Sequence, residues 1–193
     1  MNTYEKLEVA AHRAYTRGIQ TGNGGNLSAR CEDGMIVKSS GGSFADCRAD
    51  GTGFVETDLN GNMRSASGKP TREVFLHGLV YKLCPEAGSV MHCHSPWSIA
   101  WSFDHEVLPM TTLHMGLKVG YDIPVLDVPN ASVREIDAPI IEQAFLQNPK
   151  LRAFILRGHG IVAIAKDPLE AEHLAELIEE TAQIATLRKL PTA

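Results

Sequence analysis

Residues 153–168 read AFILRGHGIVAIAKDP, and they combine the patterns of a strand pair and of a helix start. Two runs rich in aliphatic and aromatic residues, 153–157 and 161–164, are typical of buried β-strands. They are separated only by Gly158-His159-Gly160, in which the two glycines allow the backbone to turn sharply. The stretch therefore predicts two consecutive strands joined by a tight kink that presents one histidine side chain.

The residues that follow predict a long helix up to residue 189. Asp167 suits its N-cap position and Pro168 its first helical position. Outward from this region, strand-like and helix-like segments alternate along the chain. Strands are expected over 27–30, 35–39, 54–57 and 89–94, and helices over 3–17, 71–83, 96–103 and 133–146. Residues 106–128 alternate between strand-like and loop-like runs, and the prediction is one mixed α/β domain over residues 1–193.

The composition is that of a globular protein and argues against several functions. The chain has 193 residues, of which 44% are hydrophobic and 21% are charged, so we expect a sizeable core and no extensive disorder. The net charge of −5 argues against nucleic-acid binding, which needs a basic surface. No segment resembles a membrane span or a signal peptide. The four cysteines form no C-x-x-C pair and are expected to be reduced, so a cytoplasmic protein is predicted.

Three histidines form a candidate metal site. His92 and His94 are two residues apart in a predicted strand, so both side chains face the same side and can reach one ion. His159, in the predicted kink, is a good third ligand because zinc needs three or four. The alternative for the His92–His94 pair is a hydrogen-bonded surface pair without a metal.

Glu73 is a candidate acid or base. It lies in the first turn of the predicted helix 71–83, where a carboxylate interacts favourably with the helix dipole. The simplest interpretation is therefore a capping glutamate. Beside a divalent metal, the same carboxylate would be a fourth ligand or a general base.

Two loops and the start of one predicted helix are candidate anion sites. Gly24-Gly25-Asn26 and Ser39-Ser40-Gly41-Gly42 offer exposed backbone N–H groups, although either loop can equally be a simple turn. Neither is a P-loop or a dinucleotide-binding motif. Thr71 and Arg72 open the helix that carries Glu73, and a helix N-terminus with an arginine suits a phosphate or a carboxylate.

Taken in order, these motifs resemble the class II aldolase/adducin family, which includes fuculose-1-phosphate aldolase and ribulose-5-phosphate 4-epimerase. The resemblance covers residues 5–188, including a final helix similar to the family's closing helix. It implies a three-layer α/β/α fold around a largely antiparallel sheet, and homotetramers with active sites at subunit interfaces. The motifs that carry it are Gly25-Asn26-Leu27-Ser28, Ser40-Gly41, Pro70-Thr71-Arg72-Glu73, His92-Cys93-His94-Ser95 and Gly158-His159-Gly160.

The resemblance also implies a function and roles for individual residues. A member with these motifs would be a zinc-dependent lyase that cleaves a sugar phosphate to dihydroxyacetone phosphate and an aldehyde through a metal-stabilised enediolate. Glu73 would be the acid/base. The implied zinc ligands are His92, His94 and His159, and the implied phosphate-binding residues are Asn26, Ser40, Gly41, Thr71 and Arg72.

Two departures from the family pattern keep other functions open. Arg72 stands where the aldolases have a second hydroxyl, and a basic residue there resembles the branch that decarboxylates 3-oxo-tetronate 4-phosphates. The aldolase tyrosine that protonates the leaving aldehyde has no clear counterpart, and His114 is the candidate replacement, with Tyr121 or a neighbouring subunit as alternatives. Epimerase chemistry and a non-catalytic adducin-like module are further alternatives, although adducins normally lack the zinc histidines that this chain has.

Overall fold

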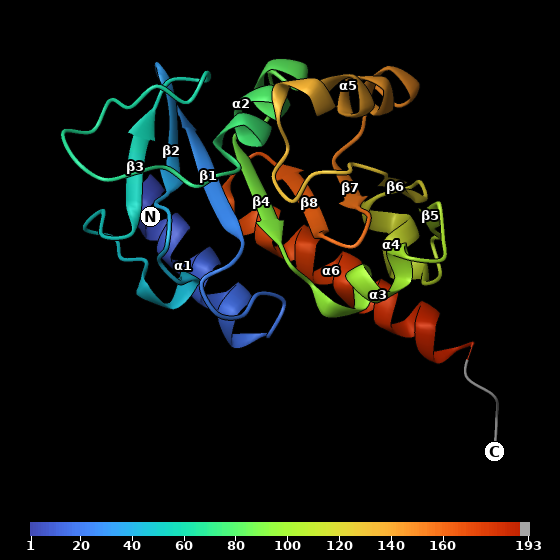
Figure 1. The fold of residues 1–193 in the computed structure, drawn as a ribbon. Helices are drawn as coiled ribbons and strands as arrows, with labels where there is room; N and C mark the ends of the chain where they lie inside the picture. Colours follow the sequence, from blue (N-terminus) through green and yellow to red (C-terminus); the bar gives the residue numbers. More distant parts are fainter. Residues whose placement is uncertain (190–193) are drawn as a thin grey trace.

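The computed structural model describes residues 1–189, which form one eight-stranded mixed sheet between two layers of helices (Figure 1). The strand order is β3-β2-β1-β4-β8-β7-β6-β5, and every neighbouring pair is antiparallel except β6 and β7. The strands are β1 (Asn26–Cys31), β2 (Gly34–Lys38), β3 (Phe54–Thr57), β4 (Ser89–Cys93), β5 (Val107–Leu108), β6 (Ile123–Leu126), β7 (Ala153–Leu156) and β8 (Gly160–Ala165). The predicted α/β/α fold with a largely antiparallel sheet is therefore confirmed.

The helices divide between the two faces of the sheet. One face is covered by α1 and α6, and the other by α2 and α5 (Figure 1). The α-helices are α1 (Thr3–Thr16), α2 (Val74–Leu83), α3 (Pro96–Ser102), α4 (Leu113–Lys118), α5 (Ala138–Gln147) and α6 (Pro168–Leu187), and the short 3-10 helices are η1 (Phe44–Asp46) and η2 (Glu135–Asp137). No helix within residues 1–189 is both long enough and apolar enough to cross a membrane.

Side chains of successive β4 residues pack into two separate hydrophobic cores, one on each face of the sheet. Met91 and Cys93 pack with α1 and α6, whereas Val90 packs with α2 and α5. Because side chains alternate along a strand, His92 faces the same layer as Val90. His92 is opposite Asn26 of β1 and Val162 of β8 in the antiparallel register. The central strands therefore bring polar side chains from distant parts of the sequence to one face of the sheet.

The predicted kink between β7 and β8 is confirmed, and both of its glycines are required. Gly158 has a φ of 65° and Gly160 a φ of 147°, which other residues rarely adopt. A β-carbon at Gly160 would lie 2.1 Å from the backbone oxygen of Cys93. The chain can therefore pass this close to β4 only with glycine at position 160, and His159 is held at the tip of the turn.

Three predictions about the helices need correction. The helix expected over 71–83 begins at Val74, so Glu73 precedes its first turn. The helix expected over 133–146 is split into η2 and α5. Within 106–128, where only strands and loops were expected, α4 forms after Thr112, whose side chain accepts the N–H of Met115. Only Met115 of α4 is buried, so this short helix has no apolar stripe by which the sequence could reveal it.

A glutamate in α6 is buried without a hydrogen-bond partner in the described part of the chain, although its Oε2 lies 3.7 Å from Nε2 of the exposed His173. Glu172 has no solvent exposure, and neither of its carboxylate oxygens has a hydrogen-bond partner within residues 1–189. Burial, reinforced by the nearby Glu176, raises the pKa of Glu172 to about 7, although Arg13 and Arg17 oppose the shift. The folded state therefore keeps this proton at pH values at which the unfolded chain releases it.

We expect this carboxyl to make the protein less stable as the pH rises from about 4.5 to about 7. Over that interval the folded state binds up to one proton more than the unfolded state, and the full shift sets an upper limit of about 3 kcal/mol on the effect. Glu172→Gln removes the titration, so urea unfolding of the variant at a series of pH values should show a flatter dependence than the wild type. Glu180→Gln, on the exposed face of the same helix, is the matched control. Parallel curves for wild type and Glu172→Gln would contradict the assignment.

Candidate metal centre and substrate pocket

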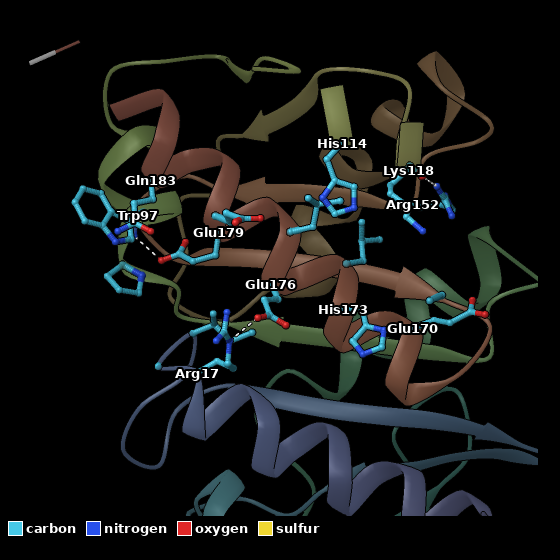
Figure 2. Close-up of a pocket in the computed structure, with 17 residues that line it drawn as sticks. Arg17, Trp97, His114, Lys118, Arg152, Glu170, His173, Glu176, Glu179 and Gln183 are labelled. Carbon is cyan, nitrogen blue, oxygen red and sulfur yellow. Dashed lines mark hydrogen bonds and ion pairs between the residues drawn. The ribbon is translucent and has the colours of Figure 1, made fainter. Parts of the chain in front are cut away.

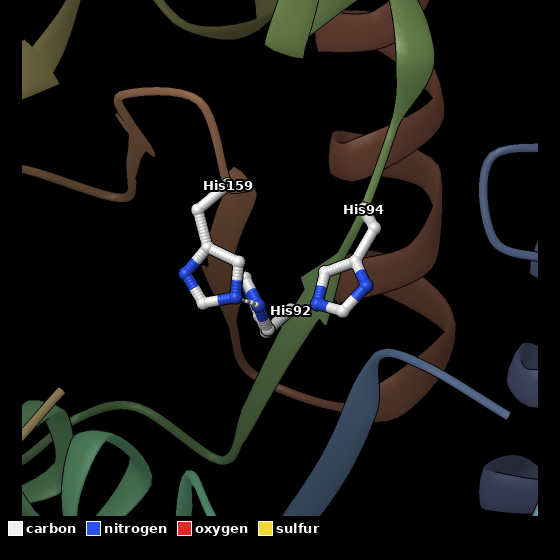
Figure 3. A group of neighbouring side chains, drawn as sticks. All are labelled: His92, His94 and His159. Atoms are coloured by element: carbon white, nitrogen blue, oxygen red, sulfur yellow. Dashed lines mark hydrogen bonds between the residues drawn. The ribbon is translucent and has the colours of Figure 1, made fainter. Parts of the chain in front are cut away.

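Three histidine side chains converge at the end of β4 (Figure 3). His92 lies in β4, His94 directly follows it, and His159 comes from the turn before β8. The Nε2 atoms of His92 and His159 are 3.3 Å apart, and one potential ligand nitrogen from each of the three residues lies within 4.8 Å of the others. The fold therefore brings together the three histidines that the sequence singled out.

The protonation of the cluster suits a cation. His92 Nδ1 donates a hydrogen bond to the backbone oxygen of Ile161 at 2.9 Å, which leaves the Nε2 lone pair free. Burial, together with the neighbouring histidines, lowers the pKa of His92 well below its ordinary value and that of His159 to about 4. Burial, with a contribution from Lys38, also lowers the pKa of His94. Three neutral imidazoles whose ring nitrogens lie within 4.8 Å of one another are a donor set that fits a catalytic zinc ion.

The glycine-rich loop before β1 supports His94 by close packing. The backbone N–H of His94 donates to Oε1 of Gln20 at 2.8 Å. A β-carbon at Gly24 would lie 2.6 Å from His94 Nδ1, and one at Gly25 would lie 2.3 Å from Gln20 Oε1. A side chain at either position would therefore have to displace His94 or the Gln20 that holds its backbone, which the sequence alone did not reveal.

Glu73 does not cap α2. It occupies the N-cap position, but its side chain makes no capping hydrogen bond, so the interpretation as a capping glutamate is wrong. Its carboxylate instead accepts the backbone N–H of Val133 at 3.3 Å and a hydrogen bond from the Ser132 side chain. Glu73 is 4% exposed, and burial raises its pKa. A buried carboxyl with a raised pKa is suited to carry a proton near neutral pH.

A cavity of about 290 Å³ joins Glu73 to the histidines. Both His94 and His159 line it, together with Glu73. All of the residues expected to bind phosphate also line it, namely Asn26, Ser40, Gly41, Thr71 and Arg72. Candidate metal ligands, a candidate acid/base and candidate anion donors therefore share one cavity.

A buried hydrogen-bonded chain lies behind Asn26. His77 Nε2 is bonded to Asn26 Oδ1, and His77 Nδ1 is 2.7 Å from Ser28 Oγ, which is 2.8 Å from the Tyr81 hydroxyl. Burial lowers the pKa of His77 to about 3, so the ring is neutral and carries one proton. Because the Asn26 oxygen can only accept, that proton is on Nε2, and the amide nitrogen of Asn26 is left for the cavity.

Two residues of this site were missed by the sequence analysis. No role was assigned to His77 from the sequence, although its position four residues after Glu73 puts both on one helix face. Lys38 also lines the cavity and is the last residue of β2, a strand whose five residues are all buried. Neither residue belongs to a recognised motif, so only the fold reveals them.

The candidate second proton donors lie elsewhere in the chain. His114, on α4, lines a separate cavity of about 870 Å³ beside α6, and none of the three clustered histidines forms part of its wall (Figure 2). The Tyr121 hydroxyl accepts the backbone N–H groups of Arg152 and Ala153 at 2.6 and 3.2 Å. Within one chain, His114 therefore does not lie at the histidine cluster. The Tyr121 hydroxyl is occupied by hydrogen bonds to the backbone at the start of β7.

Comparison with known proteins identifies the family of the chain. A 3-oxo-tetronate 4-phosphate decarboxylase from Escherichia coli is 28% identical over 185 residues, which are 93% of this chain and 84% of that protein. An L-fuculose phosphate aldolase from Methanocaldococcus jannaschii is 27% identical over 181 residues, covering 92% of each chain. The crystal structure of L-fuculose-1-phosphate aldolase from Thermus thermophilus has a TM-score of 0.85 at 25% identity, covering 99% of this chain and 98% of that one. The family model described as Class II Aldolase and Adducin N-terminal domain matches residues 5–186, and the chain therefore belongs to the class II aldolase and adducin family.

Proposed function

We propose that the protein is a zinc-dependent carbon–carbon lyase that acts on a phosphorylated sugar. The first reaction we propose is aldol cleavage of a fuculose 1-phosphate-like ketose phosphate to dihydroxyacetone phosphate and an aldehyde. The observation that carries the proposal is the convergence of His92, His94 and His159 beside the cavity that contains the buried carboxyl of Glu73. The decarboxylase and aldolase relatives support the reaction class.

The three histidines would hold the zinc ion through neutral ring nitrogens. When bound, zinc supplies a Lewis acid that polarises a substrate carbonyl and stabilises negative charge on its oxygen. Glu73 would hold and transfer the proton at the carbon next to that carbonyl. It is the one carboxyl residue lining this cavity within residues 1–189, and its raised pKa favours the protonated form that a donor needs.

The substrate phosphate would bind at the loops around Asn26. The Asn26 amide nitrogen, the hydroxyls of Ser40 and Thr71 and the backbone N–H of Gly41 are neutral donors, and hydrogen bonds from such donors suit a phosphate. Arg72 is exposed at the cavity, where its guanidinium suits a second anionic group. These local donors matter because the chain as a whole carries a net charge of −5.

Decarboxylation of a 3-oxo-tetronate 4-phosphate-type acid is the second candidate reaction, and two observations favour it. Arg72 offers a bidentate partner for a carboxylate where the aldolases have a hydroxyl. Loss of CO₂ also needs one proton at the remaining carbon, which Glu73 alone can deliver. Aldol cleavage also needs a further group to take the proton from the hydroxyl that becomes the aldehyde oxygen, and the candidate His114 lines a different cavity of the chain.

A product-resolved screen of the zinc-loaded protein separates these reactions. Fuculose 1-phosphate and its stereoisomers should yield dihydroxyacetone phosphate if the first proposal is right. If they yield none while a 3-oxo acid phosphate releases CO₂, the aldolase proposal is wrong and the decarboxylase proposal takes its place. Zinc content below about a tenth of an equivalent after gentle purification would contradict both, and would favour a non-catalytic adducin-like module.

We also propose a homotetramer whose active sites lie between subunits. Leu113 and Leu117 are 91% and 86% exposed and lie one turn apart on α4, an arrangement that favours contact with another subunit. His114 lies between these two leucines in the sequence of α4, so contact through this helix would place His114 near a neighbouring subunit. This arrangement would provide the second proton-transfer group that the cavity of a single chain lacks.

A further inference from the structure

A buried carboxylate of α6 holds the first turn of α3. Glu179 Oε1 accepts the backbone N–H of Trp97 at 2.8 Å (Figure 2). Its Oε2 accepts the backbone N–H of Ser98 at 2.9 Å and the Ser98 hydroxyl at 2.7 Å. Ser98 is fully buried and Glu179 is 6% exposed. The first N–H groups of a helix have no partner within the helix, so this carboxylate satisfies donors that would otherwise be buried without an acceptor.

The N-terminal end of α3 is continuous with a candidate metal ligand. His94 directly precedes Ser95, the N-cap residue of α3. The Ser95 hydroxyl donates to the backbone oxygen of Ile19 at 3.0 Å, and the backbone N–H of His94 donates to Gln20 Oε1. His94 therefore lies only three residues before the first N–H group that Glu179 binds.

The C-terminal end of α3 holds the turn that presents a second ligand. The Ser102 hydroxyl accepts the backbone N–H of Gly158 at 2.9 Å. The Phe103 ring also lies against this turn, since a β-carbon at Gly158 would be 3.0 Å from its Cε1 atom. His159 is the next residue along the chain. One short helix therefore connects the segment that carries His94 with the segment that carries His159.

A helix as short as α3 does not fix its own position. It has seven residues, and helices of this length are stable only through contacts with the rest of the protein. It packs against α6, β7 and β8. Among these contacts, the three hydrogen bonds to Glu179 determine where the first turn of α3 lies on α6.

We propose that Glu179 is a positioning residue for the candidate metal centre, because it anchors α3 and thereby sets the place of His94 relative to His159. The inference rests on the proposed metal site and concerns a residue to which the proposed chemistry gives no role. Glu179 lines the cavity beside α6 and not the one with the histidines, so it acts through α3. A glutamine cannot replace it, because in either orientation its NH₂ group would face a backbone N–H.

Zinc affinity, and the visible absorption of the cobalt-substituted protein, test this role in Glu179→Gln. We expect the variant to bind zinc about 10-fold more weakly or worse, as for other residues that orient metal ligands. The d–d bands of bound Co²⁺ depend on ligand geometry and should shift or change in intensity. Both measurements are made well below the melting temperature of each variant, so that unfolded protein does not contribute.

Two control variants separate positioning from stability. Glu180→Gln makes the same change at the neighbouring exposed glutamate and should keep the zinc affinity and the cobalt spectrum of the wild type. Asp167→Ala removes the N-cap of α6, whose carboxylate accepts the Glu170 N–H at 3.0 Å. That variant should have a lower melting temperature and an unchanged metal site. A loss of zinc affinity in Asp167→Ala as large as that in Glu179→Gln overturns the proposal, because any loss of stability would then suffice.

Wild-type zinc affinity together with a wild-type cobalt spectrum in Glu179→Gln also overturns the proposal, even if the melting temperature falls. A change in either, with both controls like the wild type, supports it. If Glu179→Gln fails to fold, Ser98→Ala decides, because it removes one of the three hydrogen bonds and keeps the other two. A changed cobalt spectrum in Ser98→Ala supports the role, and an unchanged one overturns it. Failure of the metal site itself is distinct, because His159→Ala would then bind zinc as the wild type does.

Discussion

Glu73→Gln should lower turnover about 100-fold or more and leave the zinc content unchanged. The substitution keeps the size of the side chain, and the amide oxygen can still accept the backbone N–H of Val133. The capacity to exchange a proton near neutral pH is the property that is lost. Because the side chain does not cap α2, the helix should keep its start and the protein its stability.

Turnover is measured with whichever substrate the product screen identifies, and zinc is measured by elemental analysis of the same preparations. Glu142→Gln, at an exposed position of α5, is the matched control and should behave as the wild type. Kinetics like those of the wild type in Glu73→Gln would refute the acid/base role. Loss of zinc from that variant would instead identify Glu73 as a metal ligand.

His159→Ala should weaken zinc binding by more than about 100-fold and abolish activity with it. Residues that merely orient a metal ligand typically change affinity 10–100-fold, so removal of a ligand should cost at least as much. The His159 Nε2 lies 3.3 Å from that of His92, and neither ring is positively charged near neutral pH because both pKa values are lowered. Removal of His159 leaves two neutral imidazoles, fewer than zinc requires.

The zinc affinity is measured by competition with a chromophoric chelator, and the melting temperature is followed with and without zinc. Zinc should raise the melting temperature of the wild type, because a ligand that binds only the folded state stabilises it, and should have little effect on the variant. His173→Ala removes an exposed histidine outside the cluster and should keep full zinc affinity. Equal zinc affinity in wild type and His159→Ala would disprove this metal site.

The strand pattern of the sequence was enough to predict the centre of the fold. The sequence predicted β7, β8 and their kink from the apolar runs 153–157 and 161–164 and from the glycines around His159. Both runs are short and rich in aliphatic residues, as buried strands are, and the glycines stand where the backbone turns. The helix α4 could not be predicted in this way. Its leucines Leu113 and Leu117 face outward, so its pattern does not depend on the core of its own chain.

The candidate site was predictable where a motif carries it and not where packing creates it. The histidine motifs predicted the cluster of His92, His94 and His159, which the structure brings within reach of one another. Lys38 is buried beside η1, whose Phe44 ring centroid lies 6.0 Å from Lys38 Nζ, and η1 carries no motif that would reveal this contact. The direction of the Glu73 side chain depends on Val133, sixty residues later in the chain. Contacts between segments far apart in the chain produce no hydrophobic periodicity or motif, so the sequence could not predict them.

The chain of hydrogen bonds from Tyr81 through Ser28 and His77 to Asn26 has a consequence for how the cavity distinguishes ligands. A neutral imidazole has two tautomers, and they would turn opposite ends of the Asn26 amide towards the cavity. With the proton on Nε2 the cavity receives an N–H donor, and with the proton on Nδ1 it would receive a carbonyl acceptor. The tautomer of His77, a fully buried residue behind the cavity wall, therefore determines whether Asn26 presents a hydrogen-bond donor or an acceptor to a ligand.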